Sequence, residues 1–269
     1  MAEFVTRFAP SPTGLLHLGH AASALHVWQG AQDAGGTVLL RIEDIDTTRC
    51  RPEYTEAILQ DLSWLGLQWP QPVRIQSQHF EDYARVVADL AARGLAYRCF
   101  QTRAQLADNP PAPLRPADVQ ARLDVGQPFA WRLSLNAARA SLGKQWRELA
   151  YTVETTNGPT TIAAQPERHG DIILARKDSP SAYHLAATCD DALQGITHVI
   201  RGEDLIDAPH IQTLLQVLMD WPQPIYRHHA LVLGPDGKRL SKRHKSVALA
   251  ALRQDGMTPE DIRMQLGFT

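Results

Sequence analysis

The chain has 269 residues, of which 44% are hydrophobic and 21% charged, and its formal net charge is −2. This composition is ordinary for a globular protein with one large domain or two small ones. It excludes a globally basic chain, so a nucleic-acid partner would require a local basic patch. The N-terminal residues contain no long apolar run and predict neither a signal peptide nor a membrane anchor.

Three cysteines, Cys50, Cys99 and Cys189, are too far apart in the sequence to form a CxxC or CxC pair. This spacing argues against a disulfide framework and against a zinc cluster. Reduced thiols are typical of the cytosol, and we therefore expect a cytoplasmic protein.

The first part of the chain alternates strand and helix patterns. A short strand, a loop rich in proline and glycine, a helix and a buried apolar strand follow one another, and this order predicts a βαβ unit in a parallel sheet. Two more helices are expected because apolar residues recur at three- and four-residue spacing until a glycine stops each run. The expected elements are strands at 4–9 and 38–42 and helices at 19–31, 52–65 and 80–93.

The character of the sequence then changes at a proline-rich break, DNPPAPLRPAD, over residues 108–118. Short strand patterns follow, and we interpret residues 98–180 as a partly β insertion between two halves of the main sheet. The remaining expected elements are strands at 129–135, 149–155, 183–188, 198–201 and 230–233, a helix at 208–219, and two short helices at the end of the chain.

The first candidate site is the sequence His17-Leu18-Gly19-His20 at the start of an expected helix. Two histidines three residues apart project toward the same side of the first turn. This helix end carries unsatisfied backbone N–H groups and a partial positive charge, which together suit a phosphate. Imidazoles can donate hydrogen bonds to it, and Gly19 leaves room for a nucleotide base. The alternatives are two ordinary, partly buried histidines or a zinc pair, although no HExxH motif is present.

The second candidate site is the run 238–245, in which six of eight residues are basic. A turn signal, Pro235-Asp236-Gly237, precedes it. A loop so dense in cations can close over a triphosphate and stabilise charge that develops during phosphoryl or adenylyl transfer. The alternatives are a solvated charge run or a nucleic-acid-binding patch.

Together these two segments resemble the HIGH and KMSKS signatures of the class I aminoacyl-tRNA synthetases. Residues 7–14 (RFAPSPTG) and 41–46 (RIEDID) are similar to the versions of the glutamyl-specific members, and residues 199–204 (VIRGED) resemble a third family motif. The resemblance covers most of the chain and is weakest over about 100–180.

The resemblance implies an α/β fold with a Rossmann-like parallel-sheet core and a mixed α+β insertion. The expected core comprises residues 1–97 and 181–235, the insertion comprises residues 98–180, and the KMSKS-type loop with short terminal helices comprises residues 236–269.

The resemblance also places L-glutamate against five residues, and the chemistry of their side chains agrees. Glutamate has two carboxylates, which arginine binds through paired hydrogen bonds, and one ammonium, which needs an anion. Glu43 would face the ammonium, Arg7 and Arg201 would bind carboxylates, and Tyr183 and Ser11 would add polar contacts. The alternatives are a helix-capping role for Glu43 and a structural ion pair for Arg201.

ATP is expected against His17, Gly19, His20, Ser241 and Lys242, with His17, His20 and Lys242 as catalytic residues. We expect it as its Mg²⁺ complex, with the ion held mostly by phosphate and water oxygens. Arg239 replaces the first lysine of the KMSKS signature, which leaves Lys242 as the equivalent of the second.

No resident metal is expected. Cys99 is a single thiol at a place where many zinc-containing relatives carry a pair. We therefore do not expect a structural zinc.

The chain continues for 27 residues after Lys242 (from 242 to 269), whereas a full glutamyl-tRNA synthetase continues into a helical anticodon-binding domain. We expect no such domain here.

The sequence resembles the short glutamyl-queuosine tRNA(Asp) synthetases, which attach glutamate to queuosine at the wobble position of tRNA(Asp). The implied partners are L-glutamate, ATP and queuosine-containing tRNA(Asp), with no membrane, and we expect a monomer. Candidate RNA contacts are Arg49, Arg51 and the 238–245 loop.

Three alternative functions stay open at this point. The first is an enzyme of the same chemistry that charges a tRNA 3′ end. The second is a non-catalytic paralogue that binds RNA. The third is a nucleotidyltransferase that acts on a substrate other than an amino acid.

Replacing Lys242 with alanine tests the role assigned to the basic run. We expect the rate of glutamate-dependent ATP–pyrophosphate exchange to fall by ~10² or more, because the lysine ammonium would stabilise charge in the transition state. An unchanged exchange rate would contradict that role.

Overall fold

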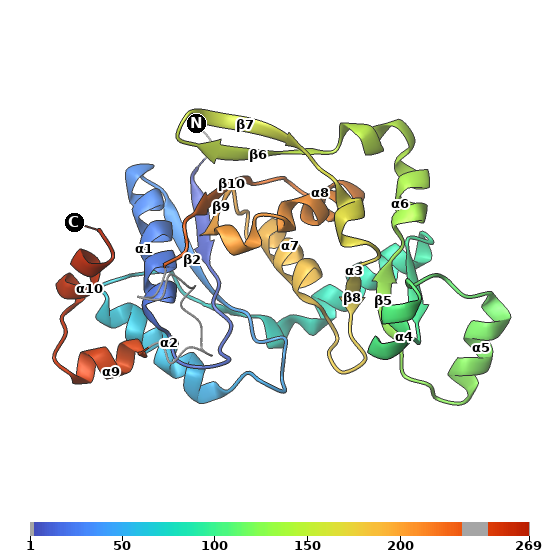
Figure 1. The fold of residues 1–269 in the computed structure, drawn as a ribbon, viewed down its shortest axis with the longest axis horizontal. Helices are drawn as coiled ribbons and strands as arrows, with labels where there is room; N and C mark the ends of the chain where they lie inside the picture. The colour runs from blue at the N-terminus through green and yellow to red at the C-terminus, as the bar shows by residue number, and fades with distance from the viewer. Residues whose placement is uncertain (1–2, 233–246, 269) are drawn as a thin grey trace.

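Parallel strands form the centre of the fold (Figure 1), and the computed structural model describes residues 3–232 and 247–268. Strands β1 (Val5–Phe8), β2 (Thr37–Ile42) and β3 (Arg74–Ile75) run parallel in the order β1-β2-β3. Strands β9 (His198–Gly202) and β10 (Ile225–His229) are also parallel neighbours. The amide of Thr197 donates to the carbonyl oxygen of Val5 at 2.9 Å. This contact places β9 beside β1 and continues the parallel layer.

Helices connect the strands of this layer. Helix α1 (Leu18–Asp33) links β1 to β2, α2 (Pro52–Trp64) lies between β2 and β3, α7 (Tyr183–Leu193) precedes β9, and α8 (Ala208–Leu218) links β9 to β10. From the centre, the chain adds β2 and β3 on one side of β1 and β10 on the far side of β9. The strand order therefore reverses between β1 and β9, and open α/β sheets bind ligands at the carboxyl ends of strands at such a point.

Helix α1 packs unusually closely on the centre of the sheet. A Cβ atom at Gly30 would lie 2.5 Å from Cδ1 of Ile200 on β9, so the absence of a side chain at Gly30 allows this approach. Apolar side chains of α1, β1, β2 and α2 form one buried cluster there. The packing places α1 next to both central strands.

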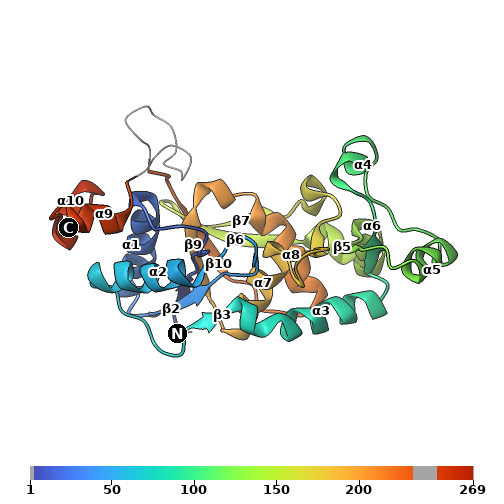
Figure 2. The same ribbon diagram turned by 90° about the horizontal axis from the view of Figure 1, so that it is seen from below.

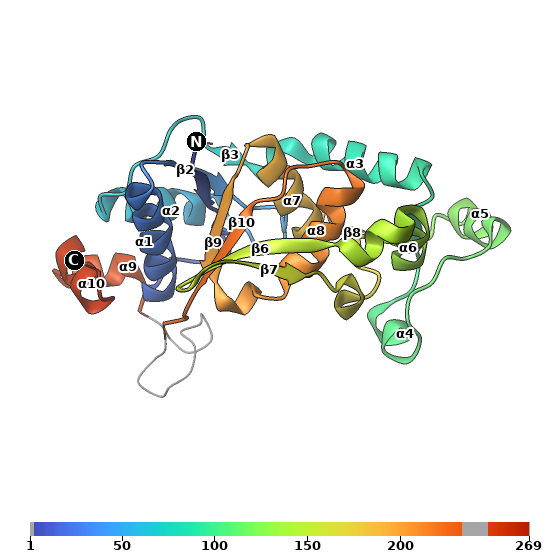
Figure 3. The same ribbon diagram turned by 90° about the horizontal axis from the view of Figure 1, so that it is seen from above.

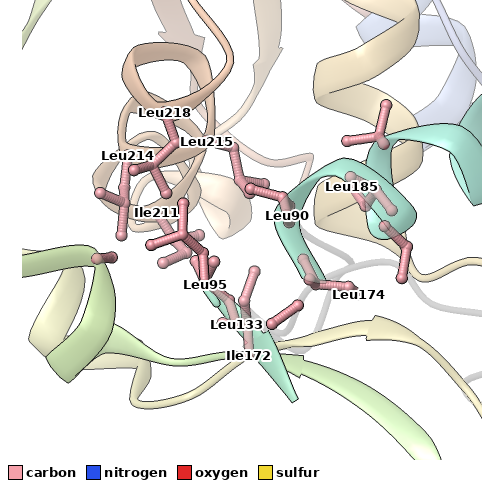
Figure 4. Close-up of a cluster of buried hydrophobic side chains, with 14 of the residues drawn as sticks. Leu90, Leu95, Leu133, Ile172, Leu174, Leu185, Ile211, Leu214, Leu215 and Leu218 are labelled. Atoms are coloured by element: carbon pink, nitrogen blue, oxygen red, sulfur yellow. The ribbon is translucent and has the colours of Figure 1, made fainter. Parts of the chain in front are cut away.

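The predicted insertion contains a small sheet and several helices. Strands β4 (Ala96–Cys99), β5 (Ala130–Leu133) and β8 (Ile173–Ala175) pair antiparallel in the order β4-β5-β8. Helix α3 (Phe80–Ala92) runs from β3 toward this sheet (Figure 2), and the region also contains α4 (Arg103–Asp108), α5 (Pro116–Asp124) and α6 (Leu135–Leu142). Leu90 of α3, Leu133 of β5, Leu185 of α7 and Leu214 of α8 belong to one buried cluster (Figure 4), through which the insertion packs against the core.

A hairpin from the predicted insertion joins the main sheet. Strands β6 (Ala150–Thr155) and β7 (Gly158–Ala163) pair antiparallel, and β6 pairs parallel to β10 where Val153 meets Tyr226. Figure 3 shows the hairpin reaching from the insertion to β9 and β10. The sheet order is β7-β6-β10-β9. The domain boundaries at 98 and 180 stay a prediction, because this pairing crosses them.

Two short helices, α9 (Leu249–Gln254) and α10 (Pro259–Gln265), close the described chain and lie near α2 (Figure 1). Helices of this length are not stable alone and depend on tertiary contacts. Nη1 of Arg253 lies 3.2 Å from Oδ1 of the buried Asp61, and Nη2 of Arg263 donates to the carbonyl oxygen of Leu65 at 2.8 Å. These contacts attach the C-terminal segment to the end of α2.

The α/β fold with a parallel sheet is confirmed, and most expected strands and helices match the observed elements within two residues. One exception is the expected strand at 183–188, which is wrong because these residues begin α7. A short buried apolar run fits both a strand and a helix. Leu185, Ala186 and Cys189 all reach the same buried cluster, and this spacing is that of a helix.

The expected strand at 230–233 is also wrong. The strand is β10, which ends at His229, and the described residues 230–232 lie outside it. The apolar run after β10 was the stronger strand pattern in the sequence. Pairing with β9 instead selected a polar segment, because its side chains have partners, such as Glu154 for Arg227 at 2.6 Å.

Within the described residues, no helix combines the length and the apolar character that crossing a lipid bilayer requires.

Candidate active site

A cavity of about 530 Å³ lies at the carboxyl ends of β1 and β9, where the strand order reverses. Its volume falls within the range of small-molecule sites. Ser241 and Lys242, which the sequence also predicts at the site, lie outside the described residues. The cavity brings together all the other site residues predicted from the sequence, which are Arg7, Ser11, His17, Gly19, His20, Glu43, Tyr183 and Arg201.

The two histidines cap helix α1. Nδ1 of His17 accepts from the backbone N–H of Gly19 at 3.1 Å, and Nδ1 of His20 accepts from the backbone N–H of His17 at 3.2 Å. This reciprocal pattern satisfies backbone donors that a helix start otherwise leaves unpaired. Because Nδ1 is the acceptor in each ring, the neutral ring carries its proton on Nε2. Each histidine therefore has an Nε2–H donor beside the N-terminus of α1, and this arrangement suits a phosphate.

Arg201, near the end of β9, is 5% exposed, and its neighbours hold two of its three nitrogens. Nη1 donates to Oε1 of Gln212 at 3.1 Å, and Nε donates to Nε2 of His228 at 3.4 Å. Burial, followed by the charge of Arg201, lowers the pKa of His228 to about 4, so this ring stays neutral. Nη2 of Arg201 is buried and has no hydrogen-bond partner within residues 3–232 and 247–268. A buried guanidinium with an unused donor at a cavity suits an anionic ligand.

Arg7 and Glu43 belong to a buried network of charges. Nε of Arg7 donates to Oδ1 of Asp191 at 3.0 Å. Nη2 of Arg41 donates to the same oxygen at 2.8 Å and to Oε1 of Glu43 at 3.3 Å. Nε of Arg41 also lies 3.9 Å from Oδ2 of the buried Asp190, so charges of both signs are gathered at this end of the sheet.

The pKa values of the buried Glu43 and Asp191 are shifted in opposite directions. Desolvation raises the pKa of Glu43, although Arg41 and Arg7 oppose this effect. Desolvation also acts on Asp191, but Arg7 and Arg41 together hold its pKa below the ordinary value. Asp191 therefore keeps its negative charge to lower pH than Glu43 does, and the ionisation of Glu43 depends on the nearby Arg41 and Arg7.

Tyr183 and Ser11 add polar groups to the cavity. Tyr183 is the first residue of α7, and burial raises the pKa of its hydroxyl, which therefore keeps its proton at neutral pH. Ser11 lies in the loop after β1. The backbone N–H of Glu43 donates to the carbonyl oxygen of Pro10 at 3.0 Å, which ties this loop to the end of β2.

The site also uses residues that the sequence analysis did not identify. Nε2 of His229 lies 3.1 Å from Oγ of Ser23, and both residues line the cavity. Arg41 left a detectable signal, because it precedes Glu43 by two positions and alternate residues of a strand share a face. Asp191 left none, since it lies 184 residues from Arg7 in the sequence.

Among the described residues, no three or more histidine, cysteine, aspartate or glutamate side chains are grouped so that they could hold a metal ion. The buried thiol of Cys99 lies 3.6 Å from Oε1 of Gln101. The expectation of no structural zinc stays a prediction.

Comparison with known proteins decides the family. A family model described as the catalytic domain of the class I tRNA synthetases (E and Q) matches residues 3–268. The chain belongs to this family. This synthetase chain is 40% identical to a Glutamyl-Q tRNA(Asp) synthetase of Rhodobacter capsulatus, over 98% of its own length and 100% of that relative's. A protein of the same name from Symbiobacterium thermophilum is 39% identical, over 97% of this chain and 85% of its own length.

A solved structure supports the class I fold. The crystal structure of a glutamate tRNA ligase from Elizabethkingia meningosepticum, in complex with its amino acid, matches with a TM-score of 0.72 and 29% identity. The match covers 90% of the synthetase chain and 52% of that ligase. The Glutamate–tRNA ligase of Coprothermobacter proteolyticus is 37% identical over 95% of this chain and 56% of its own length. The chain thus spans about half the length of these ligases.

Substitution of His17 separates its capping role from its other roles. We expect His17→Ala to lower the free energy of unfolding by about 1 kcal/mol, because α1 loses an N-cap acceptor. Asparagine is a favourable N-cap residue, so His17→Asn should restore most of that stability.

Urea denaturation measures both variants. The control is Leu15→Ala, an exposed position in the same loop, which should change the free energy of unfolding by less than about 0.5 kcal/mol. A His17→Ala protein as stable as the unmodified chain would show that the cap contributes nothing.

Proposed function

We propose that this synthetase activates L-glutamate with ATP and transfers the glutamyl group to the queuosine base of tRNA(Asp). The observation that carries the proposal is the buried cluster of Arg7, Arg201 and Glu43, in which Nη2 of Arg201 has no partner in the described chain. A dicarboxylic amino acid matches this cluster group for group. Its carboxylates pair with the arginines, and its ammonium pairs with Glu43.

The unused donor of Arg201 favours glutamate over its amide. A carboxylate pairs with a guanidinium through charge-assisted hydrogen bonds, whereas the neutral side-chain amide of glutamine forms weaker ones.

The N-terminus of α1 supplies the nucleotide side of the proposed reaction. The Nε2–H groups of His17 and His20 and the helix dipole would stabilise the phosphates of ATP, bound as its Mg²⁺ complex. Gly19 would leave room for the nucleotide base. Ser241 and Lys242, which lie outside the described residues, are also proposed to bind ATP. A carboxylate oxygen of glutamate then attacks the α-phosphorus. The new O–P bond forms as the bond to pyrophosphate breaks, and glutamyl-adenylate results. The protein contributes positioning and charge stabilisation.

The acceptor is proposed from the relatives named Glutamyl-Q tRNA(Asp) synthetase, which match the chain over nearly all of its length. A hydroxyl of the queuosine ring would attack the adenylate carbonyl, and AMP would leave. Arg49 and Arg51 lie in the loop before α2 and are candidate phosphate contacts. The side chain of Arg49 is 70% exposed and pairs with Asp46 at 2.7 Å, so it stands at the surface.

Substituting Arg201 tests the amino-acid pocket. We expect Arg201→Gln to raise the KM for glutamate by about 10- to 100-fold, because the ligand loses a charge-assisted hydrogen bond worth about 1.5–3 kcal/mol. The KM for ATP should change by less than about twofold, since ATP phosphates bind at α1. Glutamate-dependent ATP–pyrophosphate exchange measures both constants.

The matched control is Arg227→Gln on the neighbouring strand. Arg227 pairs with Glu154 at 2.6 Å, and among the described residues it is not part of the cavity wall. Its substitution should leave the KM for glutamate unchanged. Equal effects of the two substitutions would argue against a glutamate-binding role for Arg201.

The acceptor is tested with labelled glutamate, ATP and tRNA(Asp) that either contains or lacks queuosine. We expect label only on the queuosine-containing tRNA, and periodate oxidation of the 3′ end beforehand should not prevent it. Equal labelling of both tRNAs, or labelling that periodate abolishes, would instead support charging of the 3′ end. Exchange activity with no labelled RNA would contradict the acceptor while leaving glutamate activation intact.

A further inference from the structure

Two charged residues lie behind the cavity and contact its wall. Arg41, on β2, is fully buried at 0% exposure, and Asp191, on α7, is 7% exposed. In the described chain neither residue lines the cavity. Each nevertheless contacts a residue that does, since Arg41 reaches Glu43 and Asp191 reaches Arg7.

The guanidinium of Arg41 joins acceptors from two elements. Nη1 donates to Oε1 of Gln194 at 2.9 Å, just after α7. Nη2 donates to Oδ1 of Asp191 at 2.8 Å and to Oε1 of Glu43 at 3.3 Å. A planar fork can serve these acceptors together, whereas a lysine ammonium at the same place is a single point charge. The position of the Glu43 carboxylate is therefore coupled to α7 through one side chain.

Asp191 orients a second cavity residue in the same way. Its Oδ1 accepts from Nε of Arg7 at 3.0 Å and from Nη2 of Arg41. In the described part of the chain, Nε is the one nitrogen of Arg7 that donates to another side chain. The Nη groups of Arg7 are thus left for a ligand. Because the two arginines share one carboxylate oxygen, movement of one displaces the other.

We propose that Arg41 and Asp191 form a positioning pair, in which Arg41 holds Glu43 as an ionised carboxylate for the substrate ammonium and Asp191 holds Arg7 for a substrate carboxylate. This inference rests on the proposed function, because it assigns the pair to glutamate binding. Neither residue touches the substrate. Both act on KM for glutamate through the residues that do.

The charge of Glu43 gives the pair a measurable signature. Glu43 binds an ammonium only when ionised, so the KM for glutamate rises as the pH falls through the pKa of Glu43. Burial raises that pKa, Arg41 lowers it, and Asp191 raises it. The acid limb is the part of the pH profile in which the KM for glutamate rises as Glu43 becomes protonated. Loss of Arg41 should therefore move the acid limb to higher pH, and loss of Asp191 should move it to lower pH. The charged and titratable groups around Glu43 are Arg7 on β1, Arg41 on β2, Tyr183, Asp190 and Asp191 on α7, and Arg201 on β9, which lines the same cavity.

The experiment measures the KM for glutamate across pH in ATP–pyrophosphate exchange for Arg41→Gln, Arg41→Lys and Asp191→Asn. At neutral pH we expect each variant to raise the KM for glutamate by about tenfold or more, the effect of one weakened charge-assisted hydrogen bond. The KM for ATP should stay within about twofold of the unmodified value. The acid limb should move up for Arg41→Gln, down for Asp191→Asn, and stay near its original pH for Arg41→Lys, which keeps the charge.

Two further proteins separate positioning from simple destabilisation. Arg41→Gln/Asp191→Asn removes one charge of each sign and replaces Arg41→Gln if that protein does not fold. Its acid limb should still move up, because Arg41 contacts Glu43 directly at 3.3 Å, whereas Asp191 is joined to Glu43 through Arg41. Arg253→Gln is the structural control, since Arg253 lies 3.2 Å from the buried Asp61 of α2, and neither residue is among the charged groups around Glu43. It should lower stability without moving the limb.

The outcomes distinguish this inference from the proposed function. No glutamate-dependent exchange by the unmodified protein would overturn the proposed function itself. The unmodified protein could instead catalyse exchange while the acid limbs of Arg41→Gln and Asp191→Asn do not move or move in the same direction. That result would overturn the positioning pair alone. Opposite shifts, with the KM for ATP preserved, support it.

Discussion

The central constraint in this structure is the compensation of buried guanidinium groups at the point where the strand order reverses. Arg7, Arg41 and Arg201 come from three different strands, and an unpaired buried charge costs several kcal/mol, on the order of 3–5. Asp191 compensates two of these arginines from a helix, with distances of 3.0 and 2.8 Å. The relative positions of β1, β2, α7 and β9 are therefore linked to charge balance as well as to apolar packing.

The capping of α1 is a second local requirement, and it affects both the stability of the helix start and the position of the imidazole protons. The first turn of any helix leaves backbone N–H groups without partners. Here two imidazole rings accept from the backbone, and this use of Nδ1 leaves the proton on Nε2. The residues that complete the helix start thus also place two Nε2–H groups at the N-terminus of α1. His17, His20 and Arg201 line the same cavity, although they come from the start of α1 and from β9.

The peripheral elements support these two features through packing. The insertion shares its apolar cluster with α7 and α8, and α7 carries both Tyr183 and Asp191. The β6–β7 hairpin extends the sheet beyond β10, where Glu154 pairs with Arg227. At the other end, α9 is attached to α2 through Arg253 and Asp61. These contacts attach the peripheral elements to α7, β10 and α2. Of these, α7 carries cavity residues, and so does β10 through His229.

The sequence alone determined most of the local structure, and it selected eight residues that line the cavity. The periodicity over β1, α1 and β2 predicted those elements within two residues, because each combines a single clear period with loop residues at its ends. The motifs around His17 and Glu43 selected residues that do line one cavity. Only the tertiary structure decided that 183–188 is helical, that β10 is the polar segment before the apolar run, and that Asp191 joins Arg7 to Arg41. The physical reason is that each of these outcomes depends on a partner far away in the chain. Strand pairing, cluster packing and charge compensation act between segments that meet only when the chain is folded.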